Sequence, residues 1–203
     1  MIIPRCEELQ FDERKHIYSI DGVFIPSVTT IMRPLSNELY RGIDEAVLSR
    51  AAERGSAVHT AIENLMTYGI EDIPMEYEGY LKAFKSWRDE YKPEVHALET
   101  RVHHKAFHYA GTVDMVCTIG GKTTIVDYKT SAQVNSCLTG VQLEAYSRAY
   151  ASNFFNAEAK AILHLKRNGS YDFIEYGRLD NDSWSVFAAC LTIYNHMQRV
   201  KRG

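Results

Sequence analysis

Two short runs of alternating apolar and polar residues lie on either side of Asp21-Gly22, at residues 16–20 and 23–27. A two-residue Asp-Gly loop between such runs is typical of a tight β-turn, because both residue types tolerate the backbone angles that the turn requires. The pattern predicts an N-terminal β-hairpin.

The next two segments carry apolar residues every three or four positions, which is the spacing of an amphipathic helix. The first covers residues 44–68, and Gly55 favours a break or a bend inside it. The second covers residues 77–91 and ends before Pro93. The apolar stripes are Val47, Ala51, Val58, Ile62 and Leu65 in the first segment, and Leu81, Phe84, Trp87 and Tyr91 in the second. They predict a helical lobe after the hairpin.

Beyond Pro93 the apolar period becomes that of strands. The predicted elements are strands at 94–102, 111–119 and 122–130, a helix at 139–152, two strands at 159–166 and 170–177 around Asn168-Gly169, and a helix at 182–200. This order indicates an α/β fold in which a mixed central β-sheet is flanked by helices. We expect one domain over residues 1–203. Residues 1–92 form its hairpin and helical part, 93–178 its sheet core with the active site, and 179–203 its C-terminal helix.

Composition narrows the class of protein without identifying it. The chain has 203 residues, 45% of them apolar, and no apolar run long enough to span a bilayer, so we expect a cytoplasmic protein with no membrane partner. The first 15 residues lack the basic start and apolar stretch of a secretory signal. The formal net charge of −3 lacks the basic surplus of a non-catalytic nucleic-acid binder, although an enzyme that holds DNA locally can be mildly acidic.

The main chemical signal lies in the segment GTVDMVCTIGGKTTIVDYKT, residues 111–130. With Gly120-Gly121 as a two-residue turn, facing residues have numbers that sum to 241, and Asp114 and Asp127 are such a pair. Their Cβ atoms would lie about 5 Å apart on one face of the hairpin. Lys129 lies two residues beyond Asp127 and therefore shares that face.

Two facing carboxylates repel each other by roughly 3 kcal/mol at 5 Å and an effective dielectric near 20. A divalent cation between them reverses the sign of this interaction, and oxygen ligands are those that Mg²⁺ prefers. The pattern therefore indicates a metal-dependent active site built on Asp114, Asp127 and Lys129. The simpler alternative is a solvated polar face on which Lys129 only pairs with an aspartate.

Two further groups point to the same place. Glu99, in the preceding strand, is a third carboxylate that can reach the cation directly or through water, or else an ordinary exposed strand residue. Gln142 and Tyr146 are four apart on one helix face, which either lies over the site and holds a phosphate or a base, or is a polar flank with a core tyrosine.

These motifs in this order resemble the PD-(D/E)XK nuclease superfamily. The motifs are Gly111-Thr-Val-Asp114, Asp127-Tyr-Lys129-Thr-Ser and Gln142-x-x-x-Tyr146. The segment Arg54-Gly-Ser-Ala-Val-His59 resembles the upstream histidine helix of its RecB-type branch. The segment from His16-x-Tyr to Pro26-Ser-Val-Thr29 is similar to phage-encoded exonucleases and to the mitochondrial genome maintenance exonuclease. The resemblance covers roughly residues 16–150.

The resemblance implies a restriction-endonuclease-like core and a role for each motif residue. It implies that His59, Asp114, Asp127 and the backbone carbonyl of Tyr128 bind Mg²⁺ or Mn²⁺. Lys129 would orient the attacking water or neutralise charge in the transition state. Glu99, from its place in the preceding strand, is expected to be a further catalytic carboxylate. The residues assigned to substrate binding are Arg54, Thr130, Ser131, Gln142 and Tyr146.

The activity implied is hydrolysis of DNA phosphodiester bonds, with a single-strand exonuclease as the favoured subtype. We expect single-stranded DNA ends as substrate, a role in phage or in recombination and repair metabolism, and a single-strand-binding protein or a recombinase as candidate protein partners. Stacking on aromatic residues such as Phe107 would serve any base sequence.

Three departures from the family pattern bear on this interpretation. Val113 stands where the superfamily name places proline, and Asp127 replaces the more usual glutamate. Cys6, Cys117, Cys137 and Cys190 do not match the cysteine pattern of iron–sulfur relatives, so no iron–sulfur cluster is expected.

Two alternatives come from other classes of protein. One is a catalytically inactive nuclease fold that serves as a DNA-binding or assembly module, against which the retained aspartates and lysine argue. The other is a zinc protein, and its candidate ligands are His96, His103, His104 and His108, which lack the partner cysteines and the close spacing of zinc sites.

Overall fold

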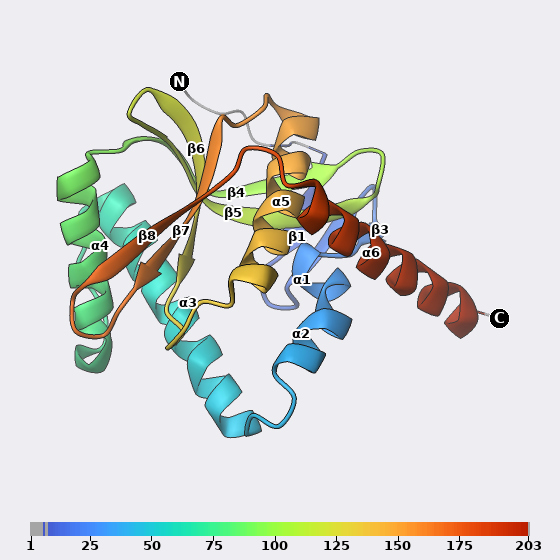
Figure 1. Ribbon diagram of the computed structural model, residues 1–203, viewed down its shortest axis with the longest axis horizontal. Helices are drawn as coiled ribbons and strands as arrows, with labels where there is room; N and C mark the ends of the chain where they lie inside the picture. The colour runs from blue at the N-terminus through green and yellow to red at the C-terminus, as the bar shows by residue number, and fades with distance from the viewer. Residues whose placement is uncertain (1–5, 7, 203) are drawn as a thin grey trace.

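A five-stranded mixed sheet is the centre of the computed structural model, which describes residue 6 and residues 8–202 (Figure 1). The strand order is β4-β5-β6-β7-β8, with every neighbouring pair antiparallel except β6 and β7, which are parallel. The strands are β4 (Glu94–His104), β5 (Tyr109–Ile119), β6 (Lys122–Lys129), β7 (Ala159–Leu165) and β8 (Tyr171–Tyr176). The α/β class and the mixed sheet predicted from the sequence are confirmed.

Helix α5 (Ser136–Asn153) connects the two parallel strands, which a tight turn cannot join. It covers one face of the sheet together with α6 (Asn181–Arg202) and α1 (Val28–Ile31), and Val113, Ile125 and Phe187 are buried there. The other face is covered by α3 (Glu45–Tyr68) and α4 (Glu78–Tyr91), where Phe84 and Trp87 are fully buried. The sheet is therefore enclosed between two helical layers.

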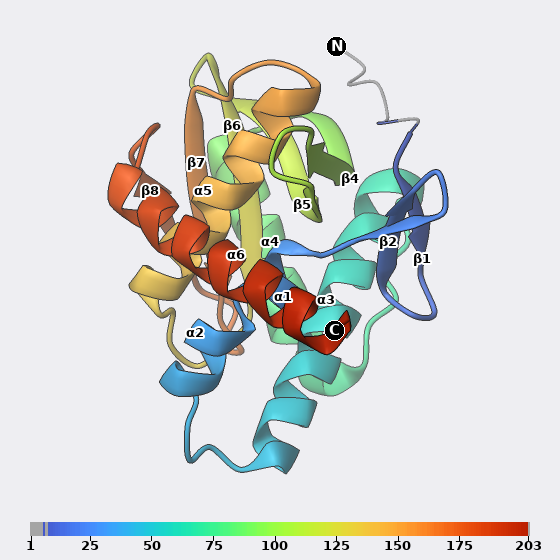
Figure 2. The same ribbon diagram turned by 90° about the vertical axis from the view of Figure 1, so that its right-hand side faces the viewer.

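The predicted N-terminal hairpin is confirmed as β2 (Ile17–Ile20) and β3 (Val23–Ile25), joined at Asp21-Gly22. Strand β1 (Gln10–Asp12) pairs with β2 and completes a second, three-stranded sheet, which the sequence pattern did not predict. Short helices α1 and α2 (Arg33–Leu39) follow, and α1 packs against α5, α6 and β5 (Figure 2). Helices of four and seven residues are too short to show a periodic stripe.

Helix α3 continues through Gly55, so the predicted break is wrong. The Asp44 side chain caps its first turn, and Gly69 in the left-handed conformation ends it. Only the second half of the predicted stripe is buried, at Val58, Ile62 and Leu65, whereas Val47 is 48% exposed because the first half of α3 extends beyond the sheet. The 3-10 turn η1 (Met75–Tyr77) leads from there into α4.

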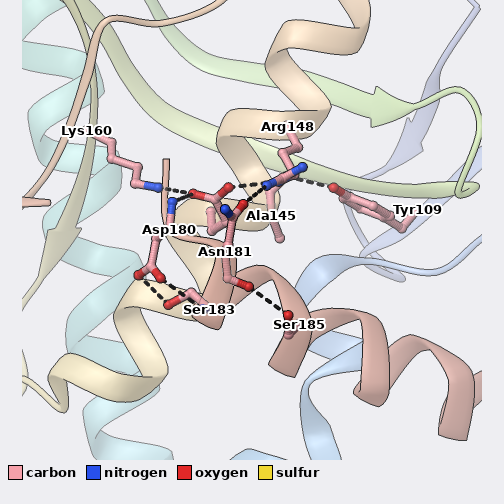
Figure 3. A network of polar contacts seen from close by, with 9 residues as sticks. Tyr109, Ala145, Arg148, Lys160, Asp180, Asn181, Ser183 and Ser185 are labelled. Carbon is pink, nitrogen blue, oxygen red and sulfur yellow. Dashed lines mark hydrogen bonds and ion pairs between the residues drawn. The ribbon is translucent and has the colours of Figure 1, made fainter. Parts of the chain in front are cut away.

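A buried ion pair between Glu144 of α5 and Lys160 of β7 fixes α5 on the sheet (Figure 3). Both side chains are 1% exposed. Arg148 Nε donates to the second oxygen of Glu144 at 2.7 Å, and Arg148 stacks over Trp184 at the start of α6. Because Glu144 lies between Gln142 and Tyr146 in the chain, this network also sets the position of the helix face that carries them.

None of the helices in the described part of the chain combines the length and the apolarity needed to cross a membrane.

Candidate active site

The β5–β6 hairpin has the register that its sequence predicts. The first pair, next to the Gly120-Gly121 turn, is Ile119 with Lys122, and the last regular pair is Met115 with Val126. The two residue numbers of every pair sum to 241. Asp114 and Asp127 come next in this register, on adjacent strands and at the same level of the sheet. Both are buried, with 7% and 3% of their surface exposed.

The regular ladder ends where these two aspartates begin. Beyond Met115 the Oδ2 atom of Asp114 accepts a hydrogen bond from the backbone N–H of Tyr128 at 2.7 Å. A carboxylate thus occupies the place of a main-chain acceptor between the two strands. This bond fixes Asp114 relative to β6 and satisfies a buried N–H.

His59, Glu99 and Asp114 bring three potential metal ligands close together. His59 Nδ1 on α3 lies 3.6 Å from Asp114 Oδ1 and 3.9 Å from Glu99 Oε1 on β4. One ligand atom from each of the three residues lies within 4.8 Å of the other two. The ring of Tyr128 packs edge-to-face on His59 with centroids 5.4 Å apart, and this contact supports the imidazole.

Glu99 reaches this group through an irregularity in β4. The pairing of β4 with β5 shifts by one residue between Val95 and Ala97, and Glu99 itself has a φ of 46°. The left-handed region is unfavourable for a residue with a Cβ and costs on the order of 1–3 kcal/mol. Strained backbone of this kind is concentrated at functional sites, and here it places a carboxylate beside Asp114.

The carboxylates destabilise one another's charged forms. Burial, together with the charges of Asp114, Glu63 and Asp127, raises the pKa of Glu99 to about 8. Burial and the charge of Asp127 raise the pKa of Asp114 to about 6, although His59, Lys129 and the Tyr128 N–H act in the opposite direction. A bound cation would relieve this repulsion directly.

Asp127 and Lys129 form a close ion pair, with 2.6 Å between Oδ2 and Nζ. Burial acts to lower the pKa of Lys129, but the charges of Asp127 and Asp114 outweigh it and raise that pKa, so the ammonium stays charged. The same Oδ2 is buried and has no partner in hydrogen-bond geometry among the described residues.

The donor set fits a hard divalent cation. An imidazole and two carboxylates converge, a third carboxylate lies within electrostatic range, and Asp127 Oδ2 lacks a directed hydrogen bond. Of the residues implied as ligands, His59 and Asp114 belong to the converging group, and Glu99 joins them. Asp127 pairs with Lys129 and lies outside that group, and Tyr128 contributes its N–H. Metal binding by Asp127 and by the Tyr128 carbonyl stays a prediction.

Gln142 and Tyr146 lie together on the face of α5 that is turned towards the site. Gln142 Nε2 donates to Tyr146 Oη at 3.1 Å. Tyr146 is 6% exposed, and the charges of Asp127 and Asp114 both act on its hydroxyl. Its ring packs so closely on Gly111 that a Cβ at residue 111 would lie 2.5 Å from Cε1. The glycine of the Gly-Thr-Val-Asp motif is therefore required by Tyr146.

The remaining predicted substrate-binding residues lie on α3 and directly after β6. Arg54 Nε of α3 points at Thr130 Oγ1, 3.4 Å away, and its guanidinium lies 5.8 Å from the centre of the Tyr80 ring. Ser131 is turned differently, because its hydroxyl donates to the Gln133 carbonyl and its own carbonyl faces His164 Nε2 at 2.8 Å.

Two residues near the site received no role from the sequence. Tyr18 of β2 is 2% exposed, and its hydroxyl lies 2.7 Å from Thr112 Oγ1, which joins the N-terminal sheet to the Gly-Thr-Val-Asp strand. Tyr18 is the tyrosine of the His16-x-Tyr motif, so the sequence already contained a feature that could have indicated it. Glu63 lies one turn after His59 on α3, and its charge raises the pKa of Glu99. Its spacing of four residues from His59, which puts both on one helix face, was the sequence feature that could have indicated it.

The histidines of the zinc alternative do not form a site. His96 Nε2 lies 2.7 Å from Thr118 Oγ1, His103 contacts Cys6, and His104 stacks on Trp184. Within residue 6 and residues 8–202, the metal-ligand group of three is the one at His59, Glu99 and Asp114. The zinc interpretation is wrong for the described chain, because these imidazoles serve separate packing contacts.

Comparison with known proteins is consistent with this geometry. A sequence model of the PD-(D/E)XK nuclease superfamily matches residues 67–184, which is more than half of the chain. No curated protein matches the chain.

Solved structures of similar fold include exonucleases. A candidate exonuclease from Eubacterium rectale is 15% identical and has a TM-score of 0.51, over 75% of this chain and 68% of its own. An alkaline exonuclease from Laribacter hongkongensis is 11% identical, with a TM-score of 0.43 over 74% of this chain and 87% of its own. At 15% identity the likeness to the Eubacterium rectale structure bears on the fold alone.

Proposed function

Because the chain belongs to the PD-(D/E)XK nuclease superfamily, we propose that it hydrolyses DNA phosphodiester bonds at the site around Asp114, with Mg²⁺ or Mn²⁺ as its metal. The observation that carries the proposal is the convergence of His59, Glu99 and Asp114 beside the Asp127–Lys129 pair. A bound divalent cation would lower the pKa of a water molecule and screen phosphate charge, so no separate side-chain base is required.

The residues of the chain have distinct tasks in this proposal. His59, Glu99 and Asp114 hold the metal, and the Tyr128 N–H keeps Asp114 oriented towards it. Lys129, whose charge is maintained by two aspartates, supplies fixed positive charge to the phosphate as negative charge develops. Asp127 positions that ammonium and is proposed as a further ligand of the metal.

Substrate contacts come from α5 and from α3 with the end of β6. Gln142 and Tyr146 on α5 offer an amide and a hydroxyl to the strand, and Arg54 with Thr130 offers donors on the α3 side. Within the superfamily we propose the RecB-like branch and a single-strand-preferring exonuclease. A role in phage or in recombination and repair metabolism, with a single-strand-binding protein or a recombinase as partner, extends this proposal.

The test is cleavage of end-labelled single- and double-stranded DNA with Mg²⁺, with Mn²⁺ and with EDTA. We expect cleavage only with metal, a preference for single strands, and little cleavage of circular single strands. Lys129→Ala should abolish turnover. Lys122→Ala removes a lysine from the exposed tip of the same hairpin and serves as the matched control.

Cleavage that persists in EDTA or in the Lys129→Ala protein would refute the proposed mechanism. DNA binding without cleavage under every condition would favour the inactive DNA-binding module. Equal cleavage of circular strands would identify an endonuclease instead of an exonuclease.

A further inference from the structure

A small pocket beside the site contains three arginines. It has a volume of about 270 Å³ and is lined by Val47, Arg50, Arg54, Glu76, Tyr77, Tyr80 and Arg167. This is smaller than the pockets that enclose a drug-sized ligand. The arginines come from two elements that are far apart in the chain, since Arg50 and Arg54 lie on α3 and Arg167 lies on the β7–β8 turn.

Arg54 links the pocket to the proposed active site. Arg54 lies 3.4 Å from Thr130, which directly follows Lys129. Arg50 is one turn before Arg54 on the same face of α3, and His59 is five residues beyond it. At 1.5 Å per residue, Arg54 and Arg50 lie about 8 Å and 14 Å from His59 along the helix axis.

In the part of the chain that the structure describes, the positive charges of these three arginines are not paired with carboxylates in the pocket. Neither Arg50 nor Arg167 has a side-chain hydrogen bond or an ion pair among the described residues, and Arg54 contacts a hydroxyl and an aromatic ring. Glu76 also lines the pocket but forms no ion pair there within the described chain. Three positive charges and one negative charge thus line the pocket, and the charge of Glu53 acts on Tyr77 from beside it, in a protein whose formal net charge is −3.

The position of Arg167 is set by close backbone packing. Gly79, at the start of α4, lies directly against the carbonyl of Arg167, and no side chain on residue 79 would fit there. The β7–β8 turn is therefore docked on α4, and Figure 1 shows this turn reaching α4 at the edge of the molecule. This docking brings Arg167 to the pocket that the α3 arginines line.

We propose that Arg50, Arg54 and Arg167 form a binding site for a phosphate group of the nucleic-acid strand, separate from the metal site. Planar guanidinium groups bind phosphate through paired hydrogen bonds. The phosphate belongs either to the end of the strand or to its interior, a few nucleotides from the cleaved bond. The choice of a phosphate rests on the proposed nuclease function.

The experiment measures binding of fluorescent single-stranded oligonucleotides by anisotropy in EDTA, where metal-dependent cleavage cannot interfere. The oligonucleotides carry a 5′-phosphate, a 3′-phosphate or no terminal phosphate. The variants are Arg50→Gln, Arg167→Gln and the double substitution, which change exposed side chains and should leave the thermal unfolding curve unaltered. Arg14→Gln, on the turn between β1 and β2, makes the same chemical change outside the pocket.

We expect each single variant to bind about tenfold more weakly than the wild type, and Arg14→Gln to bind unchanged. The slope of log affinity against log salt should become shallower by roughly 0.7 for each phosphate that the protein no longer neutralises. A weakening confined to oligonucleotides with one terminal phosphate identifies an end-binding pocket, and an equal weakening for all three identifies an internal phosphate.

Wild-type affinity in the double variant, or no measurable binding by the wild-type chain, would overturn the proposal. Cleavage by the wild type is measured separately with Mg²⁺. Cleavage together with arginine-independent binding would refute the pocket and leave the nuclease proposal standing. Arginine-dependent binding without cleavage would refute the nuclease proposal and support the pocket.

Discussion

Asp114 and Tyr128 are joined by a hydrogen bond in which a side-chain carboxylate replaces a main-chain carbonyl between two central strands. Oδ2 accepts the Tyr128 N–H, and Oδ1 faces His59. One residue thus contributes to the sheet and to the proposed metal site at the same time. Substitutions at residue 114 can separate these two contributions.

We predict that Asp114→Asn and Asp114→Ala both lose Mn²⁺ binding but differ in stability. The asparagine carbonyl can still accept from Tyr128, whereas alanine leaves a buried N–H unpaired, at a cost of about 1–3 kcal/mol. Urea unfolding in EDTA measures the free energy of unfolding, and calorimetric titration measures metal binding. Equal stability of the two variants would show that the hydrogen bond contributes little to the sheet.

Metal binding should release protons in a pH-dependent way. The pKa of Glu99 is raised to about 8 and that of Asp114 to about 6, so at pH 7 the metal-free site holds roughly one proton, mainly on Glu99. A cation must displace it, so affinity should rise as the pH increases towards 8 and level off above it. Titrating Mn²⁺ in buffers of different ionisation enthalpy counts the protons released.

The matched variant for this experiment is Glu99→Gln, which removes the titrating carboxyl. Proton release at pH 7 should then fall to a small fraction, and the pH dependence of affinity should weaken. Release that is undiminished in this variant would assign the proton to another group.

Gly111→Ala should destabilise the fold. The added Cβ would lie 2.5 Å from Tyr146 Cε1 and 3.0 Å from Cδ1, and overpacking of this kind costs about 1–3 kcal/mol. Urea unfolding of Gly111→Ala, Tyr146→Ala and the double variant should show strong coupling, because the smaller side chain removes the clash. Additive effects would mean that the alanine disturbs something other than Tyr146.

Gly55→Ala is the control for this substitution. Residue 55 lies within α3, its Cβ would meet only Thr130 Oγ1 at 3.9 Å, and alanine has the higher helix propensity. We expect its stability to equal or exceed that of the wild type by about 0.5–1 kcal/mol.

Lys160→Met should reduce the free energy of unfolding by about 1–3 kcal/mol, because the fully buried Glu144 loses its ammonium partner and keeps Arg148 as its one charged partner among the described residues. Replacing both residues, as Lys160→Met with Glu144→Leu, should recover much of this stability. Lys166→Met is the matched control, since its pair with Asp172 is largely exposed and such pairs contribute at most about 1 kcal/mol. A negligible effect of Lys160→Met would show that Arg148 alone is sufficient to compensate the charge of Glu144.

Local patterns in the sequence were sufficient for the elements that carry most of the chemistry. The register of β5 and β6 follows from a two-residue turn and a period of two, so Asp114 and Asp127 could be placed side by side before any coordinates. The Gln142–Tyr146 contact follows in the same way from a spacing of four on a helix. Each of these relations spans few residues and depends only on backbone geometry.

Only the tertiary structure decided which groups meet across the chain. His59 and Glu99 reach Asp114 from different elements, and the left-handed backbone at Glu99 leaves no signature in a hydrophobic pattern. Arg167 joins Arg50 because a turn docks on Gly79, more than 80 residues away in sequence. Periodicity reports the face on which a residue lies, whereas the packing of whole elements determines which faces come together.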